Sequence, residues 1–384
     1  MNLRERLAKL KGEFMALKKG IENGDKDAIE DARDAYDALS DEEEAQVSQG
    51  AKDKLAADEA ALGKLLNTPV IERIWGDYAN ETSAKISAKA FDESDWVVIA
   101  RDDDFADALG ATGLAGELKC PIVLTDRMEL SDAAAKEIGA LHPETVYVIG
   151  GTGAIKEQVD ADLAELGVAK VERVWGENSY DTSLECAKKI VELGGSDNNA
   201  VIAMSTNFQD ALSFSPIAYK FALPVILQTW GDTSADRGFT DEAAAWLEGK
   251  FLTVVGGPGA ISDASVEGYH VYKRIYGETG YDTSNEIAKW AIGEDYLNPS
   301  SAVIACGAQA PKGVDALAGA ALAGKIGCPI LLVSGNDAME PVDTTTIDDY
   351  LTGNAQYVLS VYVLGGGYVI PQDVVDKIEA LFKA

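Results

Sequence analysis

One pattern occurs three times in this sequence, and the repetition constrains the fold more than any other feature. In each copy an arginine is followed two residues later by an aromatic residue and then by glycine, and a threonine-serine pair lies further on. The copies are Arg73 to Ser83, Arg173 to Ser183 and Arg274 to Ser284, with nine positions between arginine and threonine and starts 100 and 101 residues apart. Self-similarity at a fixed period indicates a tandem array of structural units.

Length and charge limit the class of protein. A chain of 384 residues exceeds what one hydrophobic core usually organises, so several domains are expected. The net charge of −31 repels phosphate backbones and anionic lipids, which makes nucleic acid an unsuitable partner. No apolar run approaches the roughly 20 residues that a membrane helix needs, and the first residues lack the apolar core of a signal peptide. We therefore expect neither nucleic-acid binding nor membrane insertion.

The first 67 residues follow a different pattern from the rest. Apolar residues from Leu3 to Ile21 are spaced by threes and fours, and Ser40 with Glu43 has the spacing of a capping box. This predicts an α-helical bundle or hairpin that ends before Pro69. The predicted domains are a helical region at 1–67 and three modules at 68–168, 169–268 and 269–384.

Each module alternates short apolar runs with amphipathic segments. Continuous apolar strands separated by helices predict a parallel sheet covered on both faces, so each module is expected to be a Rossmann-like α/β sandwich. The third module has an insertion near 335–360, where behaviour specific to that copy is expected. In the first module the predicted strands are 70–75, 96–100, 121–125 and 145–149, and the predicted helices are 82–90, 105–118, 131–140 and 155–166.

The three arginines, Arg73, Arg173 and Arg274, are the first candidate site residues. They lie in predicted strands of an acidic protein, and a planar guanidinium there requires an acceptor such as a carboxylate. Two interpretations remain open: the arginine meets a repeated aspartate in its own or a neighbouring module, or it meets an anionic ligand.

The three threonines are also candidates. Thr182 with Glu185 and Thr283 with Glu286 have capping-box spacing, which predicts that the threonine begins a helix. The first copy, Thr82, has lysine at the matching position.

Three aspartates, Asp107, Asp210 and Asp315, follow the second strand of each module. The carboxyl end of a parallel strand is where ligands often bind, and it also precedes a helix that an acid stabilises. A ligand contact and a hydrogen bond at a helix start or between modules both remain open. If aspartate and arginine meet between modules, Asp210→Ala should be destabilising because it leaves a buried guanidinium unpaired. The acidic run before Asp107 is not repeated, so no metal cage is predicted.

Glycine pairs follow the fourth strand at Gly150, Gly256 and Gly365. Such turns can approach a phosphate, but no Walker lysine and no complete dinucleotide fingerprint accompanies them. Four cysteines and two histidines show no metal-ligand spacing, and Cys120 and Cys328 share a position that is Leu223 in the second copy. No nucleophile-base arrangement recurs, so no catalytic residue, no metal site and no cofactor is assigned.

The order of these motifs carries a resemblance. Arg-x-(Trp or Tyr)-Gly with Thr-Ser, then Phe-x-Asp-Ala-Leu, then an apolar Pro-initiated strand, then Tyr-Val-Ile-Gly-Gly, three times over residues 70–384, resembles the type-2 cell-wall-binding repeat of Gram-positive surface proteins. The resemblance implies three Rossmann- or Toprim-like modules in a pseudo-threefold arrangement that grip an anionic secondary polymer of the cell wall. The third copy departs from the pattern, with Gly313 in place of phenylalanine.

Three functions follow as expectations. The leading one is noncovalent anchoring of an extracellular surface protein to a cell-wall polysaccharide or teichoic-acid-like polymer, without enzymatic activity. Because the chain is acidic, binding would need a local basic groove or divalent cations that bridge protein and polymer. The alternatives are a nucleotide- or sugar-phosphate-binding enzyme or sensor and a structural surface-layer subunit.

Overall fold

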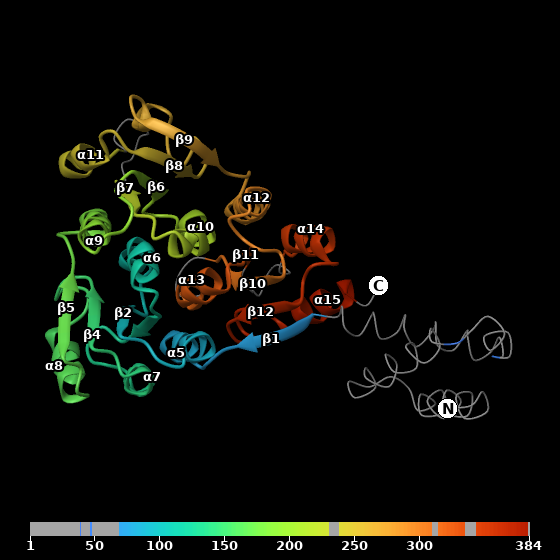
Figure 1. Ribbon diagram of the computed structural model, residues 1–384, viewed down its shortest axis with the longest axis horizontal. Coiled ribbons are helices and arrows are strands. Elements are labelled where there is room, and N and C mark those ends of the chain that lie inside the picture. Colours follow the sequence, from blue (N-terminus) through green and yellow to red (C-terminus); the bar gives the residue numbers. More distant parts are fainter. Residues whose placement is uncertain are drawn as a thin grey trace. The chain divides into compact units, whose positions relative to one another are not determined.

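The computed structural model describes residues 69–229, 238–308, 314–334 and 343–382, together with the isolated positions 39 and 47. Residues Val70–Leu381 form one compact unit, shown in Figure 1. The helical region expected at 1–67 lies outside the described residues, apart from those isolated positions. In the insertion of the third module, the described part contains a helix, α14.

The described residues form three separate four-stranded sheets. Every pair of neighbouring strands in these sheets is parallel. The strand orders are β3-β2-β4-β5, β7-β6-β8-β9 and β11-β10-β12-β1. The prediction of three parallel-sheet α/β modules is therefore confirmed.

The elements follow one scheme in each repeat. The first repeat contains β1 Val70–Ile74, α5 Ala79–Ala90, β2 Trp96–Arg101, α6 Ala106–Leu118, β3 Ile122–Thr125, α7 Asp132–Leu141, β4 Thr145–Ile149 and α8 Glu157–Glu165. The second contains β5 Lys170–Val174, α9 Ser179–Glu192, β6 Asn199–Met204, α10 Phe208–Lys220, β7 Val225–Gln228, α11 Asp241–Leu247, β8 Phe251–Val255 and the 3-10 helix η2 Ala264–Val266. The third contains β9 His270–Ile275, α12 Gly280–Gly293, β10 Ser301–Cys306, α13 Asp315–Ile326, β11 Ile330–Val333, α14 Thr345–Asn354, β12 Ser360–Leu364 and α15 Gln372–Leu381.

The arginine-bearing strand of each repeat joins the sheet of a different repeat. β5 pairs with β4 and places Arg173 opposite Val148, and β9 pairs with β8. β1 pairs with β12, the last strand of the chain's third repeat, and places Arg73 opposite Val363. The helix after each of these strands packs instead on the sheet of its own repeat, as α9 does on β7. Sheet boundaries and repeat boundaries thus differ by one strand. Each repeat gives its first strand to the sheet of the preceding repeat, and the first repeat gives its strand to the sheet of the third, so the exchange is cyclic.

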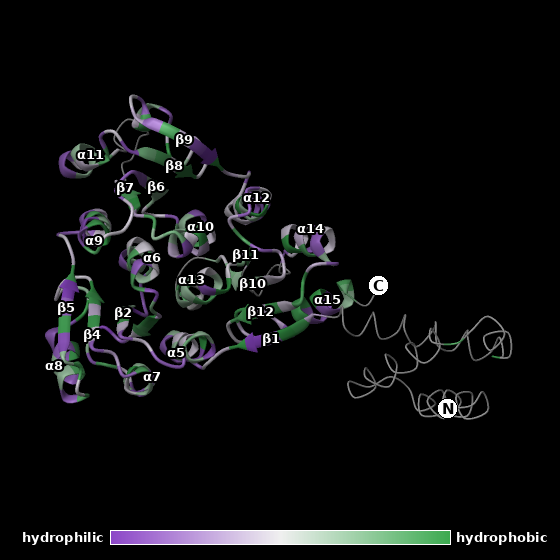
Figure 2. Cartoon of the chain, viewed as in Figure 1, coloured by the Kyte–Doolittle hydropathy of each residue, from purple (hydrophilic) through white to green (hydrophobic). Residues whose placement is uncertain are grey.

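The three helices that follow the second strands, α6, α10 and α13, pack against one another at the centre of the three sheets (Figure 1). Their approach is close because small residues line it: a Cβ built on Gly116 would lie 2.0 Å from the carbonyl oxygen of Tyr219. The Tyr219 hydroxyl donates to the carbonyl of Cys120 at 3.1 Å. Figure 2 shows the hydrophobic residues along β4 and β12, while the outer helices α8 and α11 carry both hydrophilic and hydrophobic residues. Burial therefore ties the three modules to one another as well as filling each of them.

The cysteine position behaves as a packing site. Cys120 and Cys328 are buried free thiols, and Leu223 at the matching place is partly buried. Burial raises the pKa of Cys328 to about 12, so the thiol stays protonated. Among the described helices, none is both long enough and apolar enough to span a bilayer.

Candidate functional site at the seams between repeats

The repeated motifs meet at three places that we call seams. At a seam, the glycine pair after the fourth strand of one repeat contacts the arginine strand and following helix of the next. Seam 1 joins Gly150 and Gly151 to the strand of Arg173, seam 2 joins Gly256 and Gly257 to that of Arg274, and seam 3 joins Gly365 and Gly366 to that of Arg73. Sequence motifs that lie 77, 83 and 91 positions apart within the three repeats thus come together across a boundary between repeats.

The arginine of seam 1 is largely buried, with a side chain that is 15% exposed. Its Nε and Nη2 donate to the carboxylate of Asp160 at 3.0 and 2.7 Å. Nη1 donates to the carbonyls of Gly150 at 3.1 Å and Ile155 at 2.9 Å, and Nη2 also donates to the carbonyl of Lys156 at 3.1 Å. The guanidinium of Arg173 is therefore occupied by the preceding repeat.

Seam 2 repeats this arrangement, because Arg274 Nη1 donates to the carbonyls of Gly256 and Ile261, each at 2.9 Å, and Nη2 to Asp263 at 3.1 Å. Seam 3 is weaker. Arg73 Nη1 donates to the carbonyl of Gly365 at 2.7 Å, and its buried Nη2 has no partner among the described residues. Burial lowers the pKa of Arg73.

The repeated aspartates do not meet the repeated arginines. The side chain of Asp107 hydrogen-bonds to Thr182 of the next repeat, and that of Asp210 to Thr283. Burial raises the pKa of Asp107, and it raises the pKa of Asp210 to about 6, while the bond to threonine opposes the shift in each case. The side chain of Asp315 lies outside what the structure describes. These aspartates therefore hold the helix of the next repeat, not its guanidinium.

The threonines lie within their helices, so the expected helix start at this residue is wrong. Helix α9 is capped by Asn178, whose side chain accepts from two backbone amides, and α12 by Thr279, which forms a capping box with Asp282. Thr182 accepts instead from the backbone amide of Gly176 at 3.2 Å. The same bond recurs from Gly76 to Thr82 at 3.0 Å and from Gly277 to Thr283 at 3.0 Å. The threonine thus closes the loop between the arginine strand and the helix.

The serine that follows each threonine accepts a hydrogen bond that the sequence did not lead us to expect. Ser83, Ser183 and Ser284 accept from the buried backbone amides of the third strand in their own repeat, at 2.9, 3.0 and 3.1 Å. The threonine-serine pair therefore connects one helix to two repeats. The presence of the same pair in all three copies was the sequence feature from which a structural role could have been predicted.

The aromatic residue of each motif was also missed as a candidate. A Cβ on Gly151 would lie 3.0 Å from the Trp175 ring, and one on Gly257 would lie 3.0 Å from the Tyr276 ring. Trp75 covers Gly366 in the same way at 3.2 Å. The three residues are 45%, 52% and 48% exposed in the order Trp75, Trp175 and Tyr276, and the Lys85 ammonium lies 5.7 Å from the Trp75 ring centroid. Each seam thus presents a half-exposed aromatic ring, which can stack on a flat apolar group.

The glycine turns do not form phosphate cradles. At seam 1 the amides of Ala154 and Ile155 donate to the carbonyl of Gly151 at 2.8 and 3.0 Å, and seam 2 has the same two bonds. A Cβ on Gly150, where φ is +106°, would lie 2.9 Å from the carboxylate of Asp107. The amides of Ala154 and Ile155 are therefore already used, and a buried acid lies beside the turn.

Seam 1 contains a pocket of about 400 Å3 beside the Trp175 ring. Its lining includes the carboxyl groups of Asp104, Asp107 and Glu177 but no basic side chain. Lys156 and Arg127 instead donate to carbonyls of the loop that borders the pocket. Within the part of the chain that the structure describes, no group of three acidic, histidine or cysteine residues is arranged to hold a metal ion.

Comparison with known proteins identifies the repeats. The family described as Cell wall binding domain 2 (CWB2) matches residues 73–160, 173–267 and 274–375. The chain is 27% identical over 285 residues to the amidase enhancer of Bacillus subtilis, which covers 73% of this chain and 37% of that protein. It is also 27% identical over 287 residues to the N-acetylmuramoyl-L-alanine amidase LytC of the same organism, covering 72% of this chain and 54% of that protein.

Two solved structures share the fold. Cwp8 from Clostridium difficile has a TM-score of 0.68 at 24% identity, covering 86% of this chain and 55% of that chain. Cwp6 from the same organism has a TM-score of 0.69 at 22% identity, covering 82% and 48%. The chain therefore corresponds to about half or less of the length of the relatives that it matches.

Proposed function

Since the chain belongs to the Cell wall binding domain 2 family, we propose that it anchors an extracellular surface protein noncovalently to the Gram-positive cell wall through an anionic secondary polymer. The proposed partner is a cell-wall polysaccharide or a teichoic-acid-like polymer, and the proposed role requires no enzymatic activity. The observation that carries the proposal is the match of all three repeats to a binding-domain family, with each repeat contributing one seam.

The seams are the proposed contact points because each presents a half-exposed aromatic ring. The arginines and threonines are engaged in holding the repeats together, whereas the rings of Trp75, Trp175 and Tyr276 are about half exposed. A sugar ring stacks on such a face, and three seams in one chain can engage one polymer at three points.

Charge argues for divalent cations between protein and polymer. The net charge is −31, and the pocket of seam 1 is lined by carboxyl groups without a basic side chain. An anionic polymer is repelled by such a surface unless a hard cation such as Mg2+ or Ca2+ is coordinated by oxygens of both partners. We propose the exposed carboxylate of Glu177 for this role, together with Asp104, whose carboxylate also lies 3.7 Å from the Arg101 guanidinium.

The test is retention of the full chain on isolated cell walls in millimolar Mg2+ or Ca2+, with and without a chelator. Parallel walls are treated with hydrofluoric acid to remove phosphodiester-linked polymers. We expect retention on untreated walls, loss with chelator, and loss on stripped walls. Absence of retention under every condition would refute anchoring, and equal retention with chelator would refute the cation bridge.

A variant with alanine at Trp75, Trp175 and Tyr276 tests the seams. Truncating a binding aromatic typically costs about 1 kcal/mol or more, so the triple variant should bind at least about fivefold more weakly. Tyr357→Ala is the control, because Tyr357 is 54% exposed and lies before β12, away from the carboxyl ends of the strands. Undiminished binding of the triple variant would exclude the seams as the contact points.

A nucleotide or sugar-phosphate ligand at the glycine turns fits less well, since the turn amides are already bonded. A thermal-shift screen with such ligands separates the two functions, because a ligand at 100 times its dissociation constant stabilises the folded state by about 2.7 kcal/mol. A surface-layer subunit would be recognised by ordered self-assembly of the purified chain.

A further inference from the structure

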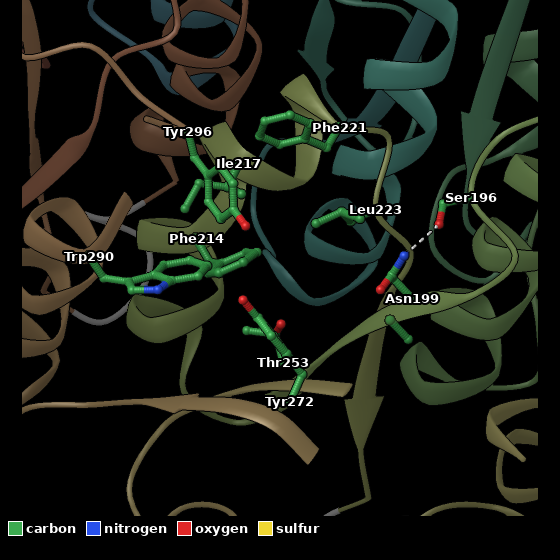
Figure 3. Close-up of a pocket in the computed structure, with 11 residues that line it drawn as sticks. Ser196, Asn199, Phe214, Ile217, Phe221, Leu223, Thr253, Tyr272, Trp290 and Tyr296 are labelled. Carbon is green, nitrogen blue, oxygen red and sulfur yellow. Dashed lines mark hydrogen bonds between the residues drawn. The ribbon is translucent and has the colours of Figure 1, made fainter. Parts of the chain in front are cut away.

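A pocket of about 340 Å3 lies between the second and third repeats, and its lining includes none of the seam residues named above (Figure 3). It lies between the sheet β7-β6-β8-β9, the end of α10 and the end of α12. Trp290 and Phe214 form one wall, and Thr253 and Tyr272 lie opposite them (Figure 3). The volume lies at the lower end of the range of small-molecule sites, about 300–1,000 Å3.

The other two sheets carry different residues at two positions of this pocket. In the first repeat, Tyr147 on β4 pairs with Glu172 on β5, and Lys189 of α9 forms an ion pair with Glu172 at 2.6 Å. The position seven residues after the motif threonine is lysine in the first and second repeats and Trp290 in the third.

The copy closed by β1 and β12 repeats the arrangement of the first. Tyr362 pairs with Glu72, which forms an ion pair with Lys89 at 2.7 Å, and the Lys89 ammonium lies 5.7 Å from the Tyr362 ring centroid. In the second repeat the tyrosine position is Thr253, so the volume of a phenol ring is missing there. Two substitutions therefore distinguish this pocket, Thr253 in the second repeat and Trp290 in the third.

The aromatic wall is ordered by contacts among its own rings. The rings of Trp290 and Phe214 are stacked, with centroids 6.1 Å apart at 21°. Tyr296 meets Trp290 edge to face at 5.2 Å and 80°, and it meets Phe221 at 5.4 Å and 70°. The hydroxyl groups of Tyr296 and Tyr272 are hydrogen bonded to each other. Such a wall loses little conformational entropy when a ligand binds.

The remaining lining is polar and uncharged. Ser196, Asn199, Thr253 and Tyr272 supply hydroxyl and amide groups, and no Asp, Glu, Lys, Arg or His is among the lining residues. Asn199 is exposed and makes only a 3.5 Å contact with Ser196. A ligand that matches this pocket has one apolar face for the rings and a hydrogen-bonding edge for the opposite side, without a charge.

From this combination we infer that the boundary between the second and third repeats carries a separate binding site for an uncharged pyranose ring. The ring's C–H face stacks on the wall formed by Trp290 and Tyr296, and its hydroxyl groups bond to Asn199, Thr253 and Tyr272. The site lies apart from the seams, so the inference does not depend on polymer binding there.

The test is saturation-transfer NMR on the full chain with methyl β-D-glucopyranoside and methyl N-acetyl-β-D-glucosaminide. The charged counterparts are methyl β-D-glucuronide and glucose 1-phosphate, and 1-hexanol is the apolar probe. We expect the neutral pyranosides to bind with a dissociation constant on the order of 1 mM, which corresponds to a weak single-ring ligand. The charged sugars and the alcohol should bind at least tenfold more weakly.

Thr253→Tyr restores the residue that the other two copies have and should weaken neutral-sugar binding at least tenfold without lowering the melting temperature. Trp290→Phe keeps an aromatic ring and should bind within about threefold of the unaltered chain, while Tyr357→Ala should leave binding unchanged. Absence of transfer from either neutral sugar, equal binding by Thr253→Tyr, or tighter binding of the charged sugars or the alcohol would each overturn the inference.

Discussion

The buried acid at seam 2 gives a quantitative prediction for Asp210→Asn. Asp210 is 4% exposed, and burial raises its pKa from 3.8 to about 6. A carboxyl group whose pKa is higher in the folded state binds more protons when folded, so it costs stability as the pH rises from about 4 to about 6. A shift of roughly two units at 1.36 kcal/mol each gives an upper bound of about 3 kcal/mol.

Asparagine has the same shape and keeps an oxygen that can accept from Thr283, but it carries no charge at any pH. The variant should therefore equal the unaltered chain near pH 4 and exceed it in stability at pH 8. At about 2 °C per kcal/mol for a unit of this size, the difference in melting temperature should grow by about 6 °C between these pH values. Taking the difference between the two proteins removes the contribution of the other carboxyl groups.

The assay is a calorimetric melt of both proteins from pH 4 to pH 8. Asp107→Asn is the matched variant, since its threonine bond is the same and burial raises the pKa of Asp107 as well. Its effect should have the same sign and be smaller, because Asp107 is less buried than Asp210. A difference that does not change with pH, or an Asp210→Asn chain that is less stable at pH 8, would refute the reasoning.

Two further sets of variants test the seams. Replacement of the motif arginine by methionine should lower the free energy of unfolding most at Arg173, by about 3 kcal/mol, less at Arg274 and least at Arg73, because the number of hydrogen-bond acceptors left without a donor falls in that order. Urea titration measures the three losses, and equal losses would contradict the hydrogen-bond count. Gly150→Ala should lower the free energy of unfolding by about 1–3 kcal/mol, since φ is +106° and the Asp107 carboxylate occupies the space of the added Cβ. In the same titration the control Gly153→Ala, whose Cβ meets nothing within 4 Å, should change it by less than about 1 kcal/mol.

Local sequence patterns predicted the central strands well because strands such as β2 and β4 are almost continuous apolar runs. The strand expected at 96–100 is β2, Trp96–Arg101, and the one expected at 145–149 is β4, Thr145–Ile149. The helix expected at 82–90 begins earlier, at Ala79. Capping-box spacing was misleading at Thr182, because Asn178 lies four residues earlier and is an equally good cap.

The strand exchange could not be read from periodicity. The sequence of a strand does not show which sheet it joins, so β5 was placed with the repeat that follows it. The expected bond between the arginine and the motif aspartate failed for the same reason, and Asp210→Ala no longer removes the partner of a guanidinium. The pocket at Trp290, in contrast, was visible in a comparison of the three copies, because lysine stands at Lys89 and Lys189.

Strand exchange also explains why the copies number three and not an open series. In a linear array the first arginine strand would have no sheet to join, and the last sheet would lack its fourth strand, leaving two unpaired edges that favour aggregation. Here β1 completes the sheet of β12, so one contact removes both defects. The arginine, glycine and threonine of each motif are thus required for closure whether or not a polymer is bound. Residues that differ among the copies, such as Trp290 and Thr253, are free of that requirement, which is why they are the better indicators of what each copy binds.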